Sequence, residues 1–458
     1  MRKVLTVLLL AMMALPVMAQ DSDMGDMVPA VTVSDQVSLD GTVMIDSIVS
    51  QTPAFIVIHR ANDEGGIGPV VGFRQVNQGM SQNVSVDIDT SNATTTLFAM
   101  LHEDSGEVGT YEFGTVEGAD LPVSVDGEVV TPAFNVEIVR AYDQLLDMNT
   151  VTIADVVTAQ DGFVVVHADN DGAPGAVLGF APVSAGANSD VTVALDGEIT
   201  PTLFPMLHVD TGEAGAYEFG TVEGADGPVV VDGVVATFDI ETGNPSMRVP
   251  DQIVTDTVTA ESVVSEGAGW LVIHADSGEG TPGPVIGFAQ VEAGTNVDVT
   301  VEVDPEGVTP RLFPMLHVDT GAEGEYEFGT VEGADGPVTV DGNVLVFGIN
   351  AAPSITYEGV LADNTLTIDS ALIDAQGWMV IHADNDGAPG AVLGFAPLVE
   401  GLNENIVVEL DEAATSVFPM LHYDTGAPGV YEFGTVEGAD GPVTVDGNVV
   451  VGNLTIEE

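Results

Sequence analysis

The segment LFPMLHVDTGEAGAYEFGTVEGADGPVVVDG, residues 203–233, decides the fold because nearly the same residues occur three more times. The counterparts occupy residues 97–127, 312–342 and 417–447, and none of them contains a gap. A second block lies upstream, and its sequence HADNDGAPGAVLGFAP is identical at 167–182 and 382–397. The chain is therefore built from copies of one unit.

The period of the repeat has the size of a domain. His59, His167, His274 and His382 hold the same position in successive copies and lie 108, 107 and 108 residues apart. Solenoid repeats have about 20–50 residues, so each of these units is long enough to fold alone. We expect a signal peptide at 1–19, a short linker at 20–28 and four domains, called repeats 1 to 4, at 29–139, 140–246, 247–354 and 355–458.

Each repeat has the pattern of a β-protein, with short valine-, isoleucine- and threonine-rich runs between glycine, aspartate and proline. In repeat 2 we expect strands at 150–157, 162–168, 176–181, 189–195, 202–209, 228–231 and 234–240. About seven short strands in about 100 residues are typical of an immunoglobulin-like sandwich. The predicted fold is all-β, with four tandem immunoglobulin-like antiparallel β-sandwich domains. The short junctions at 241–250 and 348–357 contain proline and favour a semi-rigid rod.

The charge of the chain is extreme, because seven lysines and arginines stand against 72 aspartates and glutamates. Such a surface repels nucleic acid and anionic membranes, so we expect neither as a partner. It attracts cations, and high salt would screen its self-repulsion, which is typical of halophilic adaptation. The sequence has no cysteine, which excludes disulfides, thiolate zinc sites and thiol catalysis.

The N-terminus, MRKVLTVLLLAMMALPVMAQ, has the pattern of a secretory signal peptide. A basic start precedes an apolar run from Val4 to Val17, and cleavage is expected after Ala19. No other stretch is long and apolar enough to span a bilayer, so we expect no membrane span in the mature chain. The predicted location is extracellular or at the cell surface, with the periplasm as the alternative.

Two histidines per repeat form the candidate site. In a strand, Phe163, Val165 and His167 share one face with Asp169, and Phe204, Met206 and His208 share one with Asp210. We expect the aromatic ends in the core and the His–Asp ends at one rim of the sandwich. The candidate metal ligands in the four repeats are His59, His102 and Asp104; His167, Asp169, Met206, His208 and Asp210; His274, Asp276, Met315, His317 and Asp319; and His382, Asp384, Met420, His422 and Asp424.

Three interpretations of these histidines remain open. In the structural one, each histidine is a half-buried residue at a strand end, hydrogen-bonded to an aspartate or to the backbone. In the second, two histidines and a carboxylate bind Zn²⁺, Cu²⁺ or nickel, and methionine adds a soft ligand for copper. In the third, the His–Asp pair performs acid–base catalysis, although no nucleophile motif accompanies it. Repeat 1 departs from the pattern because Arg60-Ala61-Asn62-Asp63 follows His59.

Two acidic loops offer oxygen ligands for Ca²⁺. One is the segment 169–172, and the other runs from Asp210 through Glu218, Glu223 and Asp226 to Asp232. The alternative is that aspartate and asparagine side chains bond their own backbone in turns. The recurring Tyr-Glu-Phe-Gly within the second loop is expected to hold the loop on the sandwich edge. Trp270 and Trp378, each four residues before a histidine, are interpreted as core residues.

The motifs His-Ala-Asp, Pro-Gly-Ala-Val-Leu-Gly, Met-Leu-His-x-Asp, Tyr-Glu-Phe and Gly-Ala-Asp-x-Pro-Val together resemble a domain of unknown function. That domain occurs, often repeated, in secreted and surface proteins of halophilic archaea and some bacteria. The resemblance covers nearly the whole mature chain. It implies a β-sandwich exported to the cell exterior and implies no established activity.

These patterns predict a secreted, highly acidic tandem-repeat protein with a structural or interaction role at the cell surface or in the extracellular matrix. Cations are expected to stabilise it, and its protein or surface partner stays unidentified. The alternative is an extracellular or periplasmic metal-binding protein with one His/Asp site in each repeat. We predict no enzymatic activity, because an enzyme rarely needs four serial active sites in one chain.

Overall fold

The computed structural model describes residues 28–107, 109–357, 360–362, 364–411, 414 and 416–455. The predicted signal peptide and nearly all of the predicted linker lie outside the described residues. Within them the chain forms strands and two 3₁₀ turns, η2 (Thr90–Asn92) and η3 (Pro305–Gly307), and no α-helix. No helix in this part of the chain has the length and apolar character needed to cross a membrane.

Repeat 2 shows the arrangement of strands that all four copies share. Its strands are β11 (Thr150–Thr158), β12 (Gly162–Asp169), β13 (Pro174–Val183), β14 (Gly186–Ala194), β15 (Thr202–Val209), β16 (Val230–Val231), β17 (Val234–Val235) and β18 (Ile240–Glu241). One antiparallel sheet has the order β13-β12-β15-β18, and β11 pairs with β14 in the other. The first five strands match the prediction closely, and the last two predicted strands are instead a small hairpin, β16-β17, followed by the short β18.

The other repeats contain counterparts of these eight strands in the same order, and each has one or two additional short strands at its start. Repeat 1 has β1 (Ala30–Thr32), β2 (Gln36–Ser38), β3 (Thr42–Ser50), β4 (Ala54–Ala61), β5 (Ile67–Val76), β6 (Gly79–Asp87), β7 (Thr96–Glu103), β8 (Ser124–Val125), β9 (Glu128–Val129) and β10 (Ala133–Arg140). Repeat 3 has β19 (Ser246–Arg248), β20 (Thr257–Ser265), β21 (Gly269–Asp276), β22 (Pro282–Val291), β23 (Gly294–Glu302), β24 (Arg311–Val318), β25 (Thr339–Val340), β26 (Asn343–Val344) and β27 (Ile349–Asn350). Repeat 4 has β28 (Ser354–Thr356), β29 (Val360–Ala362), β30 (Thr365–Ile373), β31 (Gly377–Asp384), β32 (Pro389–Leu398), β33 (Gly401–Glu409), β34 (Ser416–Tyr423), β35 (Thr444–Val445), β36 (Asn448–Val449) and β37 (Leu454–Thr455).

The hydrophobic core of each repeat lies between its two sheets. In repeat 2, Val164 and Val166 of β12 and Leu207 of β15 point into this core and meet Val151 and Ile153 of β11. Alternation along each strand sends every second side chain inward, so apolar residues at those positions close the sandwich. The predicted fold class, four immunoglobulin-like antiparallel β-sandwiches, is confirmed.

Repeats 1 and 2 share a strand. The first half of β10 pairs with β7 of repeat 1, and its second half pairs with β11 of repeat 2. The chain therefore passes from one sandwich into the next without a flexible linker. Thr90 of repeat 1 also donates its hydroxyl hydrogen to the carboxylate of Asp155 in repeat 2, at 2.6 Å.

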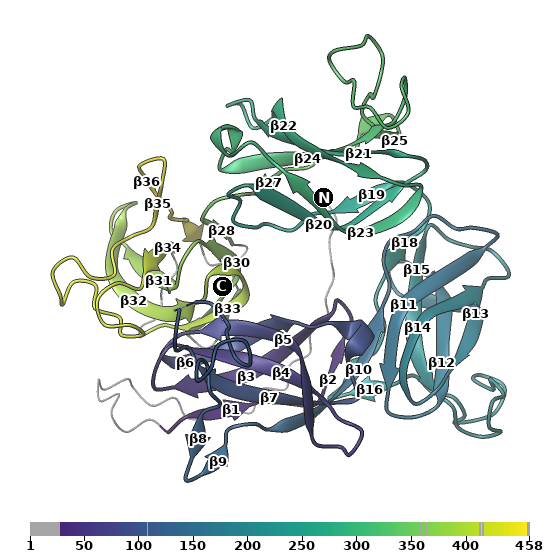
Figure 1. Cartoon of the computed structure of the whole chain (residues 1–458), viewed down its shortest axis with the longest axis horizontal. Helices are drawn as coiled ribbons and strands as arrows, with labels where there is room; N and C mark the ends of the chain where they lie inside the picture. Colours follow the sequence, from purple (N-terminus) through teal and green to yellow (C-terminus); the bar gives the residue numbers. More distant parts are fainter. Residues whose placement is uncertain are drawn as a thin grey trace.

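The four sandwiches follow one another around a circle, so that repeat 4 returns to repeat 1 (Figure 1). At the contact, Arg74 of β5 donates to the carbonyl oxygen of Leu402 at 2.7 Å, and Asn77 donates to that of Leu398 at 2.9 Å. The prediction of a rod is wrong in this respect. Proline-containing junctions limit flexibility, but they leave the bend between neighbouring domains undefined.

Candidate functional site

The two histidine strands of each repeat are neighbours in one sheet. Strands β12 and β15 run antiparallel, with Phe163 opposite His208, Val165 opposite Met206 and His167 opposite Phe204. The two imidazoles therefore lie diagonally across the Val–Met pair, on the same face of the sheet. The ring centroids of His167 and His208 are 5.9 Å apart, and the counterpart pairs in the other repeats are separated by 5.9, 5.9 and 5.6 Å.

This face is the outer face of the sheet, away from the sandwich core. The core-facing residues of β12 are Val164 and Val166, so Phe163, Val165 and His167 point the other way. Even so, Phe163 and His208 are each only 1% exposed. The expectation that aromatic ends fill the sandwich core and His–Asp ends emerge at a rim is therefore wrong. The aromatic and histidine side chains are therefore covered on the outer face by a part of the chain other than the second sheet.

The cover is the long loop that contains the recurring Tyr-Glu-Phe-Gly. The Tyr217 ring packs on Phe180 of β13 at 4.5 Å and on Phe163 at 5.3 Å, and Phe219 meets His208 edge-on at 4.9 Å. The loop thus lies across the sheet face rather than on the sandwich edge. Trp270 and Trp378 take the place of Phe163 in repeats 3 and 4, where they are buried in the same aromatic cluster.

A buried aspartate fixes this loop over the histidines. The Asp226 carboxylate is fully buried and accepts hydrogen bonds from the backbone N–H groups of Thr211 and Glu218. Its own backbone has a positive φ of 50°, a conformation that aspartate tolerates better than most residues. Counterparts at Asp120, Asp335 and Asp440 make the same bonds.

Backbone carbonyls set the tautomer of every histidine. His208 Nδ1 lies 2.6 Å from the carbonyl oxygen of Asp226, and His167 Nδ1 lies 2.9 Å from that of Gly175. Because a carbonyl can only accept, Nδ1 carries the proton in each ring and Nε2 holds a lone pair. The same bond to an aspartate carbonyl holds His102, His317 and His422, and a glycine carbonyl holds His59, His274 and His382.

The Nε2 atoms of the repeat 4 pair face one another. In repeat 4, His382 Nε2 and His422 Nε2 are 3.4 Å apart, and Met420 Sδ lies 3.3 Å from His422 Nε2. In repeats 1 to 3 the six corresponding Nε2 atoms are buried and have no hydrogen-bond partner. Neither nitrogen of a pair carries a proton to give to the other, so each site presents two unused lone pairs.

Burial favours the neutral form of five of these imidazoles. Removal from water lowers the pKa of His317 and His422 to about 4, and the hydrogen bond to the aspartate carbonyl offsets only part of the effect. Burial also lowers the pKa of His59, His102 and His208. Tyr217, under the same cover, has its pKa raised to about 12 by burial and by the charge of Asp226.

The candidate aspartates do not join the histidines. Asp169 accepts from the N–H of Gly172 in a turn, and Asp210 accepts from the N–H of Gly215. Their counterparts do the same with nearby glycines, namely Asp276, Asp384, Asp104, Asp319 and Asp424. In the part of the chain that the structure describes, no three histidine, aspartate or glutamate side chains gather as a metal cluster. Among the described residues, each histidine pair therefore lies beside a methionine, and the candidate aspartates do not lie with it.

Several carboxylates of the acidic loops accept hydrogen bonds from the backbone of the same loop. In the segment 169–172 the Asp169 side chain closes a turn, and in the longer loop Glu218 accepts from the N–H of Glu213. Glu223 and Asp232 are exposed. These bonds favour the turn interpretation over a Ca²⁺ site. The sequence interpretation also missed Met100, which occupies in repeat 1 the position of Met206; its place two residues before His102 is the signal that identifies it.

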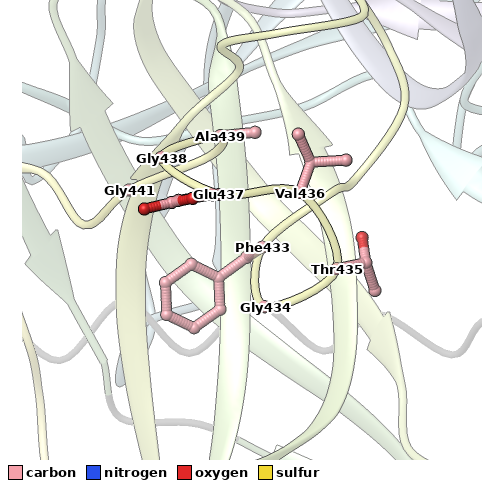
Figure 2. Close-up of a pocket in the computed structure, with 8 residues that line it drawn as sticks. All are labelled: Phe433, Gly434, Thr435, Val436, Glu437, Gly438, Ala439 and Gly441. Atoms are coloured by element: carbon pink, nitrogen blue, oxygen red, sulfur yellow. The ribbon is translucent and has the colours of Figure 1, made fainter.

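A pocket of about 400 Å³ lies in the covering loop of repeat 4 (Figure 2). Phe433, Thr435, Val436, Glu437, Ala439 and three glycines line it. Phe433 is also the ring that meets His422 edge-on, at 4.6 Å, so the pocket borders the cover of the histidine pair. Glu437 is the only ionisable residue of the lining, which contains no histidine.

The chain has a longer relative among known proteins. It is 27% identical over 302 residues to "Cell surface glycoprotein 1" of Haloarcula hispanica, an alignment that covers 60% of this chain and 31% of the relative's length. The chain thus spans less than a third of that relative.

Two solved structures are also similar. One is Escherichia coli α2-macroglobulin activated by porcine elastase, with 12% identity, a TM-score of 0.17 and coverage of 86% of this chain and 42% of the other. The second is a tetra-tandem repeat in the extending region of a large adhesion protein, with 12% identity, a TM-score of 0.14 and coverage of 94% and 100%. TM-scores this low support no argument about function. The family model described as "Domain of unknown function (DUF7282)" matches residues 29–137, 138–241, 245–350 and 353–457, so the chain belongs to this family and contains four consecutive copies of its domain.

Proposed function

We propose that this protein is a secreted, non-enzymatic structural and interaction protein of the cell surface or extracellular matrix. The observation that carries the proposal is the fixed connection of four copies of one sandwich, with β10 belonging to two of them. Four copies multiply a binding surface and add avidity without any new contact. The relationship to a protein named as a cell surface glycoprotein supports the location.

Cations belong to the proposed working state. The chain carries 72 acidic residues, and only five arginines lie beyond the predicted signal peptide to oppose them. Like charges on a folded surface repel one another, and dissolved salt shortens the range of that repulsion. Diffuse cation screening accounts for the acidity without a dedicated carboxylate site, which agrees with the internal use of the loop carboxylates.

Antibody labelling of the cells that produce the protein tests the location. We expect labelling of intact cells or recovery from the medium, whereas an intracellular control protein is labelled only after permeabilisation. Amine-reactive surface labels are unsuitable because Lys3, within the predicted signal peptide, is the only lysine. Labelling that requires permeabilisation, with the protein in the soluble intracellular fraction, would contradict the proposal. Release by disruption of the outer envelope alone would instead support the periplasmic alternative.

A further inference from the structure

We propose that each repeat binds one copper(I) ion through the two Nε2 atoms of its histidine pair and the adjacent methionine sulfur. In repeat 4 the ligands are His382, His422 and Met420. The counterpart sets are His59, His102 and Met100; His167, His208 and Met206; and His274, His317 and Met315. This site is independent of the proposed surface role.

The first argument is the unused hydrogen-bonding capacity. All eight histidines of the chain lie in these pairs, and each has its Nδ1 proton committed to a carbonyl. A buried acceptor without a partner destabilises the folded chain, and in repeats 1 to 3 both Nε2 atoms of each pair are such acceptors. A metal ion satisfies both lone pairs at once.

The second argument is distance. Two nitrogens bound to one metal at about 2.0–2.1 Å and at a tetrahedral angle lie about 3.4 Å apart. The Nε2 atoms of His382 and His422 are 3.4 Å apart, and the sulfur of Met420 lies 3.3 Å from the second of them. The two nitrogens of the repeat 4 site therefore have the spacing of two ligands of a tetrahedral ion, and the sulfur lies beside one of them.

The third argument concerns the support and burial of the rings. The carbonyls that hold Nδ1 orient both rings, as hydrogen-bonded outer groups do at established metal sites. His422 is fully buried and His382 is 4% exposed, so the ring on β31 is the less buried of the two. Phe433 and Tyr431 contact His422, and Phe433 also meets His382 edge-on at 6.4 Å, so the aromatic cover extends over both rings.

The identity of the ion follows from the ligands. No carboxylate joins the histidines in the described part of the chain, which disfavours Ca²⁺ and other ions that prefer oxygen. A thioether beside two neutral imidazoles is a soft ligand set, and soft ligands select copper(I) over Zn²⁺. The acidic chain balances the added positive charge.

Titration of the whole chain tests the proposal. The protein is stripped with a chelator and then titrated with copper(I) under anaerobic conditions against a chromophoric copper(I) chelator. We expect four ions per chain, and X-ray absorption with nitrogen and one sulfur as ligands. Met420→Leu, a swap of nearly equal volume, should weaken one of the four sites by more than about tenfold.

Met379→Leu is the matched control, because Met379 is a fully buried methionine of the repeat 4 sandwich core. It should leave all four sites intact. His422→Ala, checked for folding by circular dichroism, should abolish one site. The proposal is wrong if the chelator retains all the copper, if Zn²⁺ binds at four per chain and copper(I) does not, or if Met420→Leu and Met379→Leu behave alike. None of these results bears on the cellular location of the protein.

Discussion

Loss of the Arg74 side chain should open the circle of four sandwiches. Arg74 donates one hydrogen bond to Ser85 within repeat 1, at 3.0 Å, and one to Leu402 in repeat 4, at 2.7 Å. Only the second bond ties the two repeats together. Arg74→Ala therefore removes one of the two hydrogen bonds that join their β5–β6 and β32–β33 regions, while the bond from Asn77 to Leu398 stays.

The expected size of the effect follows from that one bond. A hydrogen bond from a charged donor contributes about 1.5–3 kcal/mol, and each 1.4 kcal/mol changes an equilibrium constant about tenfold. The ratio of open to closed molecules should rise about 10- to 140-fold. Each repeat of about 100 residues has a radius of gyration of about 13 Å. Four such repeats in contact have a combined radius of gyration of about 27 Å at the corners of a square and about 40 Å in a line. Opening of the circle should therefore raise the radius of gyration measured by scattering within that interval.

Spin labels on introduced cysteines provide the assay, since the chain has no cysteine of its own. Labels at exposed Met80 and Glu400 flank the contact, and the parent should give one narrow, short distance distribution. Arg74→Ala should broaden and lengthen it. Arg60→Ala removes the same charge from repeat 1 and is the control. If the distributions of Arg74→Ala and Arg60→Ala coincide with that of the parent, the contact does not hold the circle closed.

Three further predictions concern stability. Leu207→Ala should destabilise repeat 2 by about 2–5 kcal/mol, because Leu207 is fully buried in its core; calorimetry should show one component shifted, and exposed Val230→Ala should shift none. Raising KCl from about 0.1 to about 1 M should raise the melting temperature, because the screening length falls from about 10 to about 3 Å, and an uncharged osmolyte at equal osmolality should produce a smaller rise. Burial raises the pKa of Glu137 on β10, despite the opposing N–H of Ala159 and side chain of Thr158. The folded state therefore keeps this proton to higher pH than the unfolded state does. The charged carboxylate of Glu137 lowers the stability of the folded state at neutral pH, and this cost disappears as the pH falls through the raised pKa. Glu137→Gln should raise the melting temperature at pH 7 and bring little change at acid pH; an equal shift at both pH values would contradict this reasoning.

The sequence was sufficient to predict the first five strands of repeat 2, and it left the pairing of the two histidine strands as one possibility. The same order of aromatic, aliphatic or methionine, and histidine residues occurs in Gly162–Asp169 and Thr202–Val209. Because these strands are neighbours in one sheet, their histidines lie close together. The sequence could not decide which face is inner. Phe163, Val164, Val165 and Val166 are all apolar, so alternation shows two buried faces and does not say which of them meets the second sheet.

The rest depended on contacts between distant residues. The loop that covers the histidines is held by hydrogen bonds to the buried carboxylate of Asp226. The same loop contains several other acidic residues, so the sequence alone does not distinguish Asp226 from them. The closure of the circle depends on pairs such as Asn77 and Leu398, which are 321 positions apart. Local composition at a junction limits its stiffness, whereas the direction of the next domain is set by such long-range contacts.

The circle gives the molecule a response to mechanical load. The contact of repeat 4 with repeat 1 includes hydrogen bonds from Arg74 and Asn77, whereas each sandwich is held by full-length strand ladders and a packed core. A pull that separates repeats 1 and 4 would therefore break their contact before any domain unfolds. The chain would lengthen by straightening, would shorten again when the load is removed, and would spare its folded domains during brief stretching.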